Sequence, residues 1–201
     1  MKKALIIVDI QNDFLPGGSL AVVDGDTIIP KINQLQQHFD LVVATQDWHP
    51  ISHKSFAANH HDKKDYEIID LNGLTQVLWP IHCVQGSEGA KLNSNLKTEA
   101  ISIIIRKGMD IETDSYSAFY DNGKRNTTGL HGYLLEHKVT DVYVCGLAAD
   151  YCVYYTAKDA AELGYKVFFI EDLTKAISQQ TFIHIKNSDS DIYFINSTEI
   201  N

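Results

Sequence analysis

A cysteine stands where a strand-like run of the sequence gives way to a helical pattern. Residues 142–147 form an apolar run, and beyond Asp150 apolar residues recur at spacings of three and four, which is typical of a helix. Cys152 is therefore expected in the first turn of that helix, where free backbone N–H groups and the positive end of the helix dipole favour a thiolate. The same N–H groups can stabilise an oxyanion on an attacked carbonyl. The alternative is a small buried core residue, the common fate of a free cysteine.

Two other ionisable residues follow predicted strands and favour the catalytic interpretation. Asp9 follows the apolar run at 4–8 and Lys107 follows the run at 101–105, so both are expected at the carboxyl edge of a parallel sheet, where ligands bind. A carboxylate near Cys152 can accept the thiol proton and return it to a leaving amine, and a lysine between them stabilises both negative forms. Taken singly, Asp9 could cap a turn and Lys107 could be a solvated strand end. Together they predict acyl transfer through a covalent thioester.

Asp47, His49 and His82 form a second set that could bind a metal ion. Residues two apart on an extended segment project to the same side, so Asp47 and His49 can face one ion, and His82 would join them from another loop. One carboxylate and two imidazoles suit zinc, iron(II) or manganese and leave positions open for water or substrate. His53 is either a fourth ligand or a hydrogen-bond donor behind the ligands. The alternative is a group of loop histidines in contact with water.

Composition limits the classes of partner. The chain has 201 residues, 44% hydrophobic and 21% charged, which fits one globular domain spanning residues 1–201. It has 17 basic and 26 acidic residues, a formal net charge of -9, and no basic stripe that could bind a nucleic-acid backbone. Asp9 interrupts the first apolar run far short of the roughly 20 residues that span a bilayer, so we expect no membrane segment. Three cysteines without a C-x-x-C pair favour a reducing, cytoplasmic location.

Apolar runs alternate with amphipathic segments along the chain. Runs typical of strands buried on both faces occur at residues 4–8, 41–45, 101–105, 142–147, 166–170 and 192–195. Helical patterns occupy residues 28–39, with Pro30 in the first turn, residues 127–137, the segment that Cys152 opens and, more weakly, residues 178–186. This alternation predicts an α/β, three-layer αβα, doubly wound fold around a mainly parallel six-stranded sheet. The irregular region at 48–99 is long enough that we expect it to be functional.

A series of short motifs covers most of the chain. They read VDIQNDF at 8–14, GGSL at 17–20, TQDWHP at 45–50, WPIHCVQG at 79–86, KG at 107–108, DSYSAF at 114–119 and GLAADYCV at 146–153. In this order they resemble the nicotinamidase and pyrazinamidase branch of the isochorismatase-like cysteine hydrolase superfamily. Ala149 departs from the pattern because threonine is common there in relatives. The segment from Thr174 also lacks the usual small-residue and glycine run, which leaves the last helix and any homo-oligomer contact open.

The resemblance implies a role for each residue of the reacting centre. Cys152 would attack a carboxamide carbon, Asp9 would act as general base and acid, and Lys107 would support the ion pair. The backbone N–H groups of Ala148 and Cys152 would form the oxyanion hole, with a cis peptide bond between Leu147 and Ala148. The substrate ring would lie between apolar and aromatic walls, for which the matching residues are Phe14, Leu20, Trp79, Tyr116 and Tyr151.

The resemblance also implies one divalent metal ion on Asp47, His49 and His82, with zinc first and iron or manganese as alternatives. The ion and its waters would orient a small aromatic carboxamide by facing its ring nitrogen. The implied enzyme is an amidohydrolase of the nicotinamidase type, which hydrolyses nicotinamide to nicotinate and ammonia in NAD salvage, and pyrazinamide as well. Two other functions stay open: a metal-free relative acting on isochorismate, N-carbamoyl compounds or ureidoacrylate, and a binding module without catalysis.

Overall fold

The computed structural model describes residues 2–200. Its strands are, in chain order, β1 (Lys2–Val8), β2 (Leu41–Asp47), β3 (Ile68–Leu71), β4 (Leu74–Val77), β5 (Ile101–Lys107), β6 (Val139–Leu147), β7 (Lys166–Lys175) and β8 (Ile192–Ile195). Its α-helices are α1 (Ile29–Leu35), α2 (Leu130–Glu136), α3 (Cys152–Glu162) and α4 (Gln179–Ser188). Short 3-10 helices are η1 (Asn12–Phe14), η2 (Gly25–Ile28), η3 (Gln36–His38), η4 (Ala57–Asn59) and η5 (Ser197–Glu199). No helix within residues 2–200 combines the length and apolarity needed to cross a bilayer.

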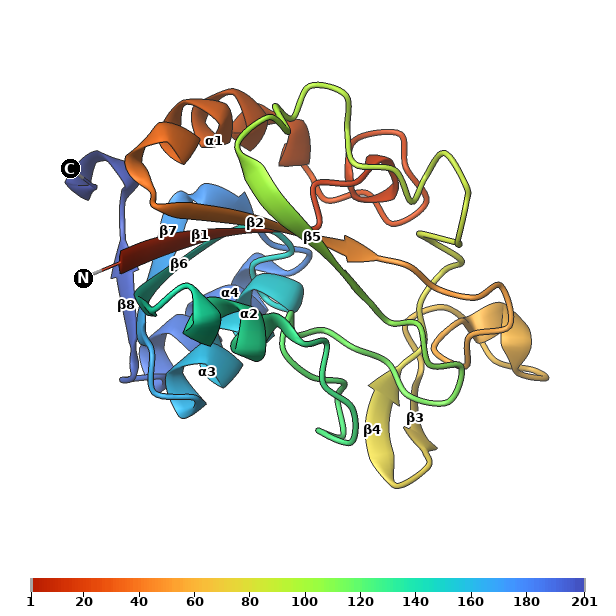
Figure 1. Cartoon of the computed structure of the whole chain (residues 1–201). Helices are drawn as coiled ribbons and strands as arrows, with labels where there is room; N and C mark the ends of the chain where they lie inside the picture. Colours follow the sequence, from red (N-terminus) through yellow and green to blue (C-terminus); the bar gives the residue numbers. More distant parts are fainter. Residues whose placement is uncertain (1, 201) are drawn as a thin grey trace.

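Six strands form one sheet in the order β5-β2-β1-β6-β7-β8, and each neighbouring pair in it is parallel. Helix α1 covers one face, and α2, α3 and α4 cover the other (Figure 1). The predicted three-layer doubly wound α/β fold is therefore confirmed. The chain runs outward from β1 to β2 and β5 and then crosses to β6 on the other side of β1. Ligands of such sheets bind where the strand order reverses, at the carboxyl ends of the strands.

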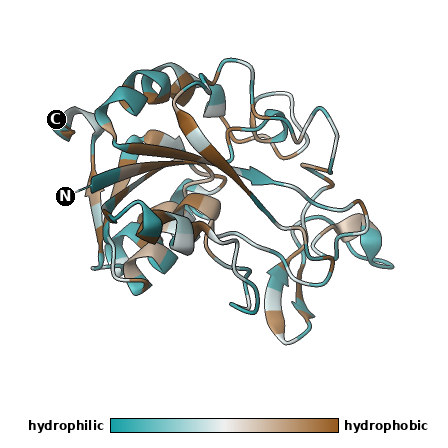
Figure 2. Cartoon of the chain, in the orientation of Figure 1, coloured by the Kyte–Doolittle hydropathy of each residue, from teal (hydrophilic) through white to brown (hydrophobic). Residues whose placement is uncertain are grey.

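The core consists of one apolar layer on each face of the sheet. Alternation along β1 sends Ala4 and Ile6 into the layer under α2, α3 and α4, and sends Leu5 and Ile7 into the layer under α1. The central strands are accordingly apolar along their length, whereas the helices are polar on their outer sides (Figure 2). Because both faces of the central strands are packed, the ends of those strands are held at fixed positions.

Four predicted elements differ from the structure. The expectation that every strand is buried on both faces is wrong for β5 and β8: burial alternates along β5, where Ile104 is 46% exposed, and Tyr193 of β8 is 56% exposed. The physical reason is that β5 and β8 are the two edge strands, whereas the helices cover the centre of the sheet. The helix expected from residue 127 begins only at Leu130, because Gly129 takes a left-handed φ of 90° that no α-helix contains. The pattern at 28–39 is divided among η2, α1 and η3.

The long region at 48–99 contains the short 3-10 helix η4 and the antiparallel hairpin of β3 and β4. Together with the surrounding loops, this hairpin lies at the end of the molecule to which the strands of the sheet point (Figure 1). Much of the region is irregular yet tightly packed, since His53, Ser55 and Phe56 are fully buried. The irregular region therefore forms a wall over the carboxyl ends of the central strands.

Candidate active site

Cys152 is the first residue of α3 and follows the turn that leaves β6. The peptide bond between Leu147 and Ala148 is cis, as the resemblance implies. Tyr151 and Val153 both donate their backbone N–H groups to the carbonyl oxygen of Ala148, each at 3.1 Å. The position expected from the change of pattern is therefore confirmed. Cys152 is only 7% exposed, so its thiol lies in a buried site at the N-terminus of a helix.

Lys107, the last residue of β5, lies at the centre of the reacting groups. Its Nζ is 2.9 Å from Asp9 Oδ2, 2.5 Å from Asp47 Oδ1 and 3.4 Å from Cys152 Sγ. It also donates to the carbonyl oxygen of Ser115 at 3.1 Å. The structure thus brings together residues from the carboxyl ends of β1, β2, β5 and β6, as the strand-end argument predicted. One buried ammonium group bridges two carboxylates and the thiol.

Thr45 on β2 holds the carboxylate of Asp9 in place. Asp9 follows β1 with a left-handed φ of 49°, and its backbone N–H donates to Thr45 Oγ1 at 3.1 Å. The hydroxyl of Thr45 in turn donates to Asp9 Oδ1 at 2.5 Å. Asp9 Oδ2 has no hydrogen-bond partner besides its ion pair with Lys107, so this oxygen is free to accept a proton. No pattern in the sequence assigned a role to Thr45, although its place two residues before Asp47 is a signal that indicates it.

Burial and charge determine the protonation states of this centre. Burial raises the pKa of Asp9, opposed by the charge of Lys107. Burial alone would lower the pKa of Lys107, but Asp47 and Asp9 raise it well above its usual value, so the amine stays charged. Burial also raises the pKa of the Cys152 thiol, against the lowering effect of Lys107. Desolvation and the two nearby carboxylates therefore oppose the thiolate that the helix terminus and the lysine favour.

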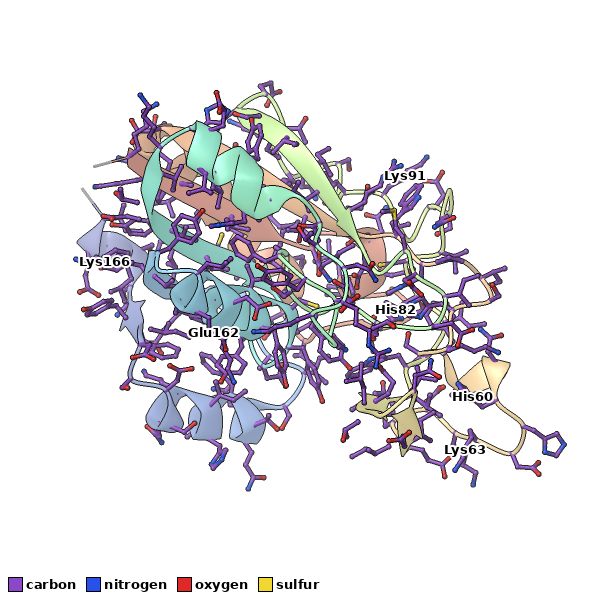
Figure 3. All side chains as sticks on the ribbon, turned by 60° about the horizontal axis from the view of Figure 1, so that its bottom comes forward. His60, Lys63, His82, Lys91, Glu162 and Lys166 are labelled. Atoms are coloured by element: carbon purple, nitrogen blue, oxygen red, sulfur yellow. The ribbon has the colours of Figure 1, made fainter. Side chains whose placement is uncertain are left out.

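Asp47, His49 and His82 face one another beside the reacting centre. Asp47 Oδ2 lies 3.6 Å from His49 Nε2 and 3.8 Å from His82 Nε2, and all three residues are buried. In Figure 3, His82 lies among the loops next to the sheet, whereas His60 and Lys63 lie at the periphery. The structure thus brings together the three residues predicted to hold a metal ion.

Hydrogen bonds fix the two imidazoles in a form that can bind a metal. His49 Nδ1 lies 2.8 Å from the carbonyl oxygen of Gly108, and His82 Nδ1 lies 2.8 Å from that of Pro80. A carbonyl oxygen can only accept, so each Nδ1 carries the proton and each Nε2 offers a lone pair. Such bonds from the outer nitrogen are what orients histidine ligands in metal sites. The donor set therefore fits a divalent ion.

Gly108 and Gln11 support these ligands from behind. A Cβ at Gly108, where φ is 66°, would lie 2.3 Å from Cε1 of the His49 ring, so only glycine leaves room for the imidazole. The side chain of Gln11 accepts from the backbone N–H of Asp47 and donates to its carbonyl oxygen, both at 2.8 Å. Gln11 thereby forms with the Asp47 backbone the two hydrogen bonds that a neighbouring strand would form, at a point where β1 has already ended. Both supports depend on residues more than 30 positions apart in the chain.

His53 and Asp114 adjoin the cluster without belonging to the set of three. The backbone N–H of Ser55 donates to His53 Nδ1 at 3.1 Å, which leaves the proton of the neutral ring on Nε2, a buried atom without a partner. Burial lowers the pKa of His53 to about 4. These contacts favour the donor role for His53 over the fourth-ligand role. Asp114 is buried near His49 and His53, and sequence reasoning gave it no role.

A pocket opens above the thiol and the three candidate ligands. Its walls contain all five residues expected to hold a substrate ring, namely Phe14, Leu20, Trp79, Tyr116 and Tyr151. Asp114, Ala148 and Ile177 also line it. Trp79 and Tyr151 meet edge to face with ring centres 4.9 Å apart. A larger cleft between β4 and α3 shares Tyr116 but holds none of the reacting groups. The smaller pocket is therefore suited to a small, flat, partly apolar molecule.

Comparison with known proteins gives consistent results across sequence and structure. The chain is 51% identical to the nicotinamidase of Acinetobacter baylyi over 174 residues, which covers 87% of this chain and 81% of that protein. A nicotinamidase/pyrazinamidase structure from Acinetobacter baumanii superposes with a TM-score of 0.94 and 46% identity, covering 100% of this chain and 98% of the other.

Two further solved structures contain bound groups. The PnC1 protein of L. infantum in complex with nicotinate is 39% identical, with a TM-score of 0.87 over 98% of this chain and 93% of that one. A pyrazinamidase of Pyrococcus horikoshii in complex with zinc is 36% identical, with a TM-score of 0.79 over 98% and 99% of the two chains.

A family model supports the same conclusion. The isochorismatase domain model matches residues 3–187, which contain every residue of the pocket and of the reacting centre. The order of strands, the buried cysteine and the relatives therefore agree, and the chain belongs to the isochorismatase family of hydrolases.

Proposed function

We propose that this protein is a nicotinamidase that hydrolyses nicotinamide to nicotinate and ammonia, with pyrazinamide as a second substrate. The close relatives named nicotinamidase, and the related structure that contains nicotinate, support this substrate class. The observation that carries the proposal is the contact of Lys107 Nζ with Asp9, Asp47 and Cys152 beneath an aromatic pocket. Such a site can hold a ring and attack the carboxamide attached to it.

The first half of the proposed reaction forms a thioester. Asp9 takes the proton of the Cys152 thiol, and the sulfur attacks the carboxamide carbon to give a tetrahedral oxyanion. In the described turns and loops, the backbone N–H groups of Ala148 and Cys152 donate to no backbone acceptor, so both are available to this oxyanion. Asp9 then returns the proton to the nitrogen as the C–N bond breaks, which releases ammonia and leaves the acyl group on sulfur.

The second half returns the enzyme to its starting state. Asp9, again ionised, takes a proton from a water molecule that attacks the thioester carbon. The C–S bond breaks, nicotinate leaves, and the Cys152 sulfur recovers its proton from Asp9. Lys107 stays charged throughout, since Asp47 holds its proton even while Asp9 is protonated. Its fixed charge favours the ionised forms of Asp9 and Cys152 when each of them appears.

Asp47, His49 and His82 would hold a divalent metal ion, for which zinc is our first choice and iron or manganese are alternatives. The related pyrazinamidase structure that contains zinc supports this assignment. When bound, the ion supplies a Lewis-acid contact that orients the ring nitrogen of the substrate. A second cluster, formed by Asp9, Asp47 and Cys152, is less suited to a cation, because Lys107 lies among all three.

The three cysteines are free thiols, which is typical of a reducing compartment. We therefore propose a cytoplasmic enzyme of pyridine nucleotide and NAD salvage, with residues 1–201 acting as a single domain. These assignments depend on the proposed activity.

An ammonia-release assay tests the proposal directly. Purified protein is given nicotinamide, pyrazinamide and an N-carbamoyl compound, before and after treatment with a chelator, and its metal is identified by elemental analysis. We expect ammonia from the two ring carboxamides, loss of turnover on chelation, and recovery when the metal is restored. Turnover of only the N-carbamoyl compound would indicate a metal-free relative. The absence of any turnover in metal-replete protein would contradict an enzymatic role.

A further inference from the structure

Ile177 lies at the mouth of the pocket, on the short segment between β7 and α4. Among the described residues that line this pocket, Ile177 alone is exposed, at 38%, while the others are buried or half-buried. Phe14, Leu20 and Trp79 are packed into the core on the side of α1, so their side chains cannot move without disturbing the fold. Ile177 is thus both a lining residue of the pocket and partly open to solvent.

The segment that carries Ile177 is tied to the turn that carries the nucleophile. Asp150, two residues before Cys152, is 2% exposed, and its two oxygens accept the backbone N–H groups of Ile177 and Ser178 at 2.9 and 2.8 Å. A third bond runs from the backbone N–H of Ala149 to the carbonyl oxygen of Lys175 at 2.8 Å. The buried carboxylate of Asp150 has no part in the proposed reaction. Its contacts fix the place of Ile177 relative to Cys152.

We propose that Ile177 is a specificity-determining residue that limits the size of ring substituent the pocket accepts, and that Asp150 is the positioning residue that holds it there. This inference rests on the proposed hydrolysis of nicotinamide. A contact made equally with the bound substrate and with the transition state changes KM and leaves kcat alone. Removing an apolar contact of a few carbon atoms changes binding about 10-fold.

The main test compares three variants on nicotinamide and on the set of nicotinamides that carry one methyl group on a ring carbon. Ile177→Ala opens the mouth and Ile177→Phe narrows it. Ile183→Ala is the matched control, since Ile183 is an isoleucine of the neighbouring helix α4, is 51% exposed and does not line the pocket. Both sites are on the surface, so the three variants should keep the fold.

For Ile177→Ala we expect KM for nicotinamide to rise about 10-fold with kcat within about two-fold. At least one methylated nicotinamide should gain about 10-fold in kcat/KM relative to nicotinamide, and Ile177→Phe should shift this ratio the other way. If Ile177→Ala behaves like Ile183→Ala on every substrate, the inference is overturned. A wild-type protein that leaves nicotinamide intact would instead contradict the proposed function, so the two failures are distinguishable.

A double-mutant cycle tests the role of Asp150. If Asp150 acts by holding Ile177, Asp150→Asn should raise KM in the wild-type background and add less than about two-fold to KM in the Ile177→Ala background. A merely structural role predicts the same loss in both backgrounds. If Asp150→Asn lowers kcat equally in the wild-type and Ile177→Ala backgrounds, Asp150 supports the nucleophile turn directly. Its proposed role in positioning Ile177 would then be rejected.

Discussion

Removing the charge of Lys107 should destabilise the protein far more than removing a surface lysine. Lys107 is 2% exposed and lies 2.5 and 2.9 Å from two buried carboxylates. With an effective dielectric constant of about 20, each contact attracts by about 6 kcal/mol. Desolvation of the charges cancels most of this attraction, so the free energy of unfolding of Lys107→Met should fall by about 3 to 5 kcal/mol at neutral pH.

Lys124 provides the matched control. It forms ion pairs with Asp159 and Glu162, but its side chain is 48% exposed. Solvent and salt screen such pairs, so Lys124→Met should lower the free energy of unfolding by about 0 to 1 kcal/mol.

The assay is equilibrium urea denaturation of metal-free protein at several pH values. In the wild type, Lys107 holds the pKa of Asp47 well below its usual value, so this stabilisation is present at neutral pH and is lost as the pH falls through the folded pKa. In Lys107→Met, burial without the lysine raises the pKa of both carboxyls. Both groups therefore take up protons as the pH falls, which removes the free-energy cost of burying their negative charges. The difference between the two proteins should therefore shrink toward acid pH. Equal losses for Lys107→Met and Lys124→Met, or a difference that does not change with pH, would refute the reasoning.

The remaining predictions concern the metal, the base and its hydrogen bond. His49→Ala should lower bound metal and turnover together, measured by elemental analysis and ammonia release; a metal-replete, fully active variant would remove the ion from the account. Gly108→Ala should weaken metal binding in competition with a chelator, because its Cβ would collide with the His49 ring, and unchanged affinity would argue against that contact. Because burial raises the pKa of Asp9 and the base must be ionised, kcat/KM should fall on the acid side with a midpoint above the ordinary value of 3.8. Thr45→Val removes a hydrogen bond that lowers this pKa, so the midpoint should move further up, while Thr45→Ser should restore it; a midpoint that stays fixed would contradict the role of Thr45.

Much of the site could be predicted because a parallel sheet gathers the carboxyl ends of its strands at one edge. Asp9, Lys107 and Cys152 each follow an apolar run in the sequence, and local pattern alone places them there. The metal-ligand set could also be predicted from the sequence, since Asp47 and His49 have the spacing of side chains that share one face of an extended segment. The wall residues of the pocket came from the family resemblance rather than from any pattern in the chain.

Other features depend on contacts between segments that no local pattern reveals. The hydroxyl of Thr45 matters only because β1 and β2 pair in a register that places it against Asp9. Ile177 reaches the pocket through a bond to Asp150, 27 positions earlier. The raised pKa of the Cys152 thiol follows from how deeply the site is buried, which a helix-start signal does not report. The alternating exposure of β5 likewise depends on its place at the sheet edge.

Steady-state ammonia release by Cys152→Ala tests the central claim most directly. Cys145→Ala is the control, because Cys145 is a buried free thiol of β6 that does not line the pocket. We predict that Cys152→Ala keeps its fold and metal but loses at least about 10⁴-fold in kcat on nicotinamide, while Cys145→Ala stays within about 10-fold of the wild type. Turnover by Cys152→Ala at a rate near that of the wild type would contradict covalent catalysis by this thiol.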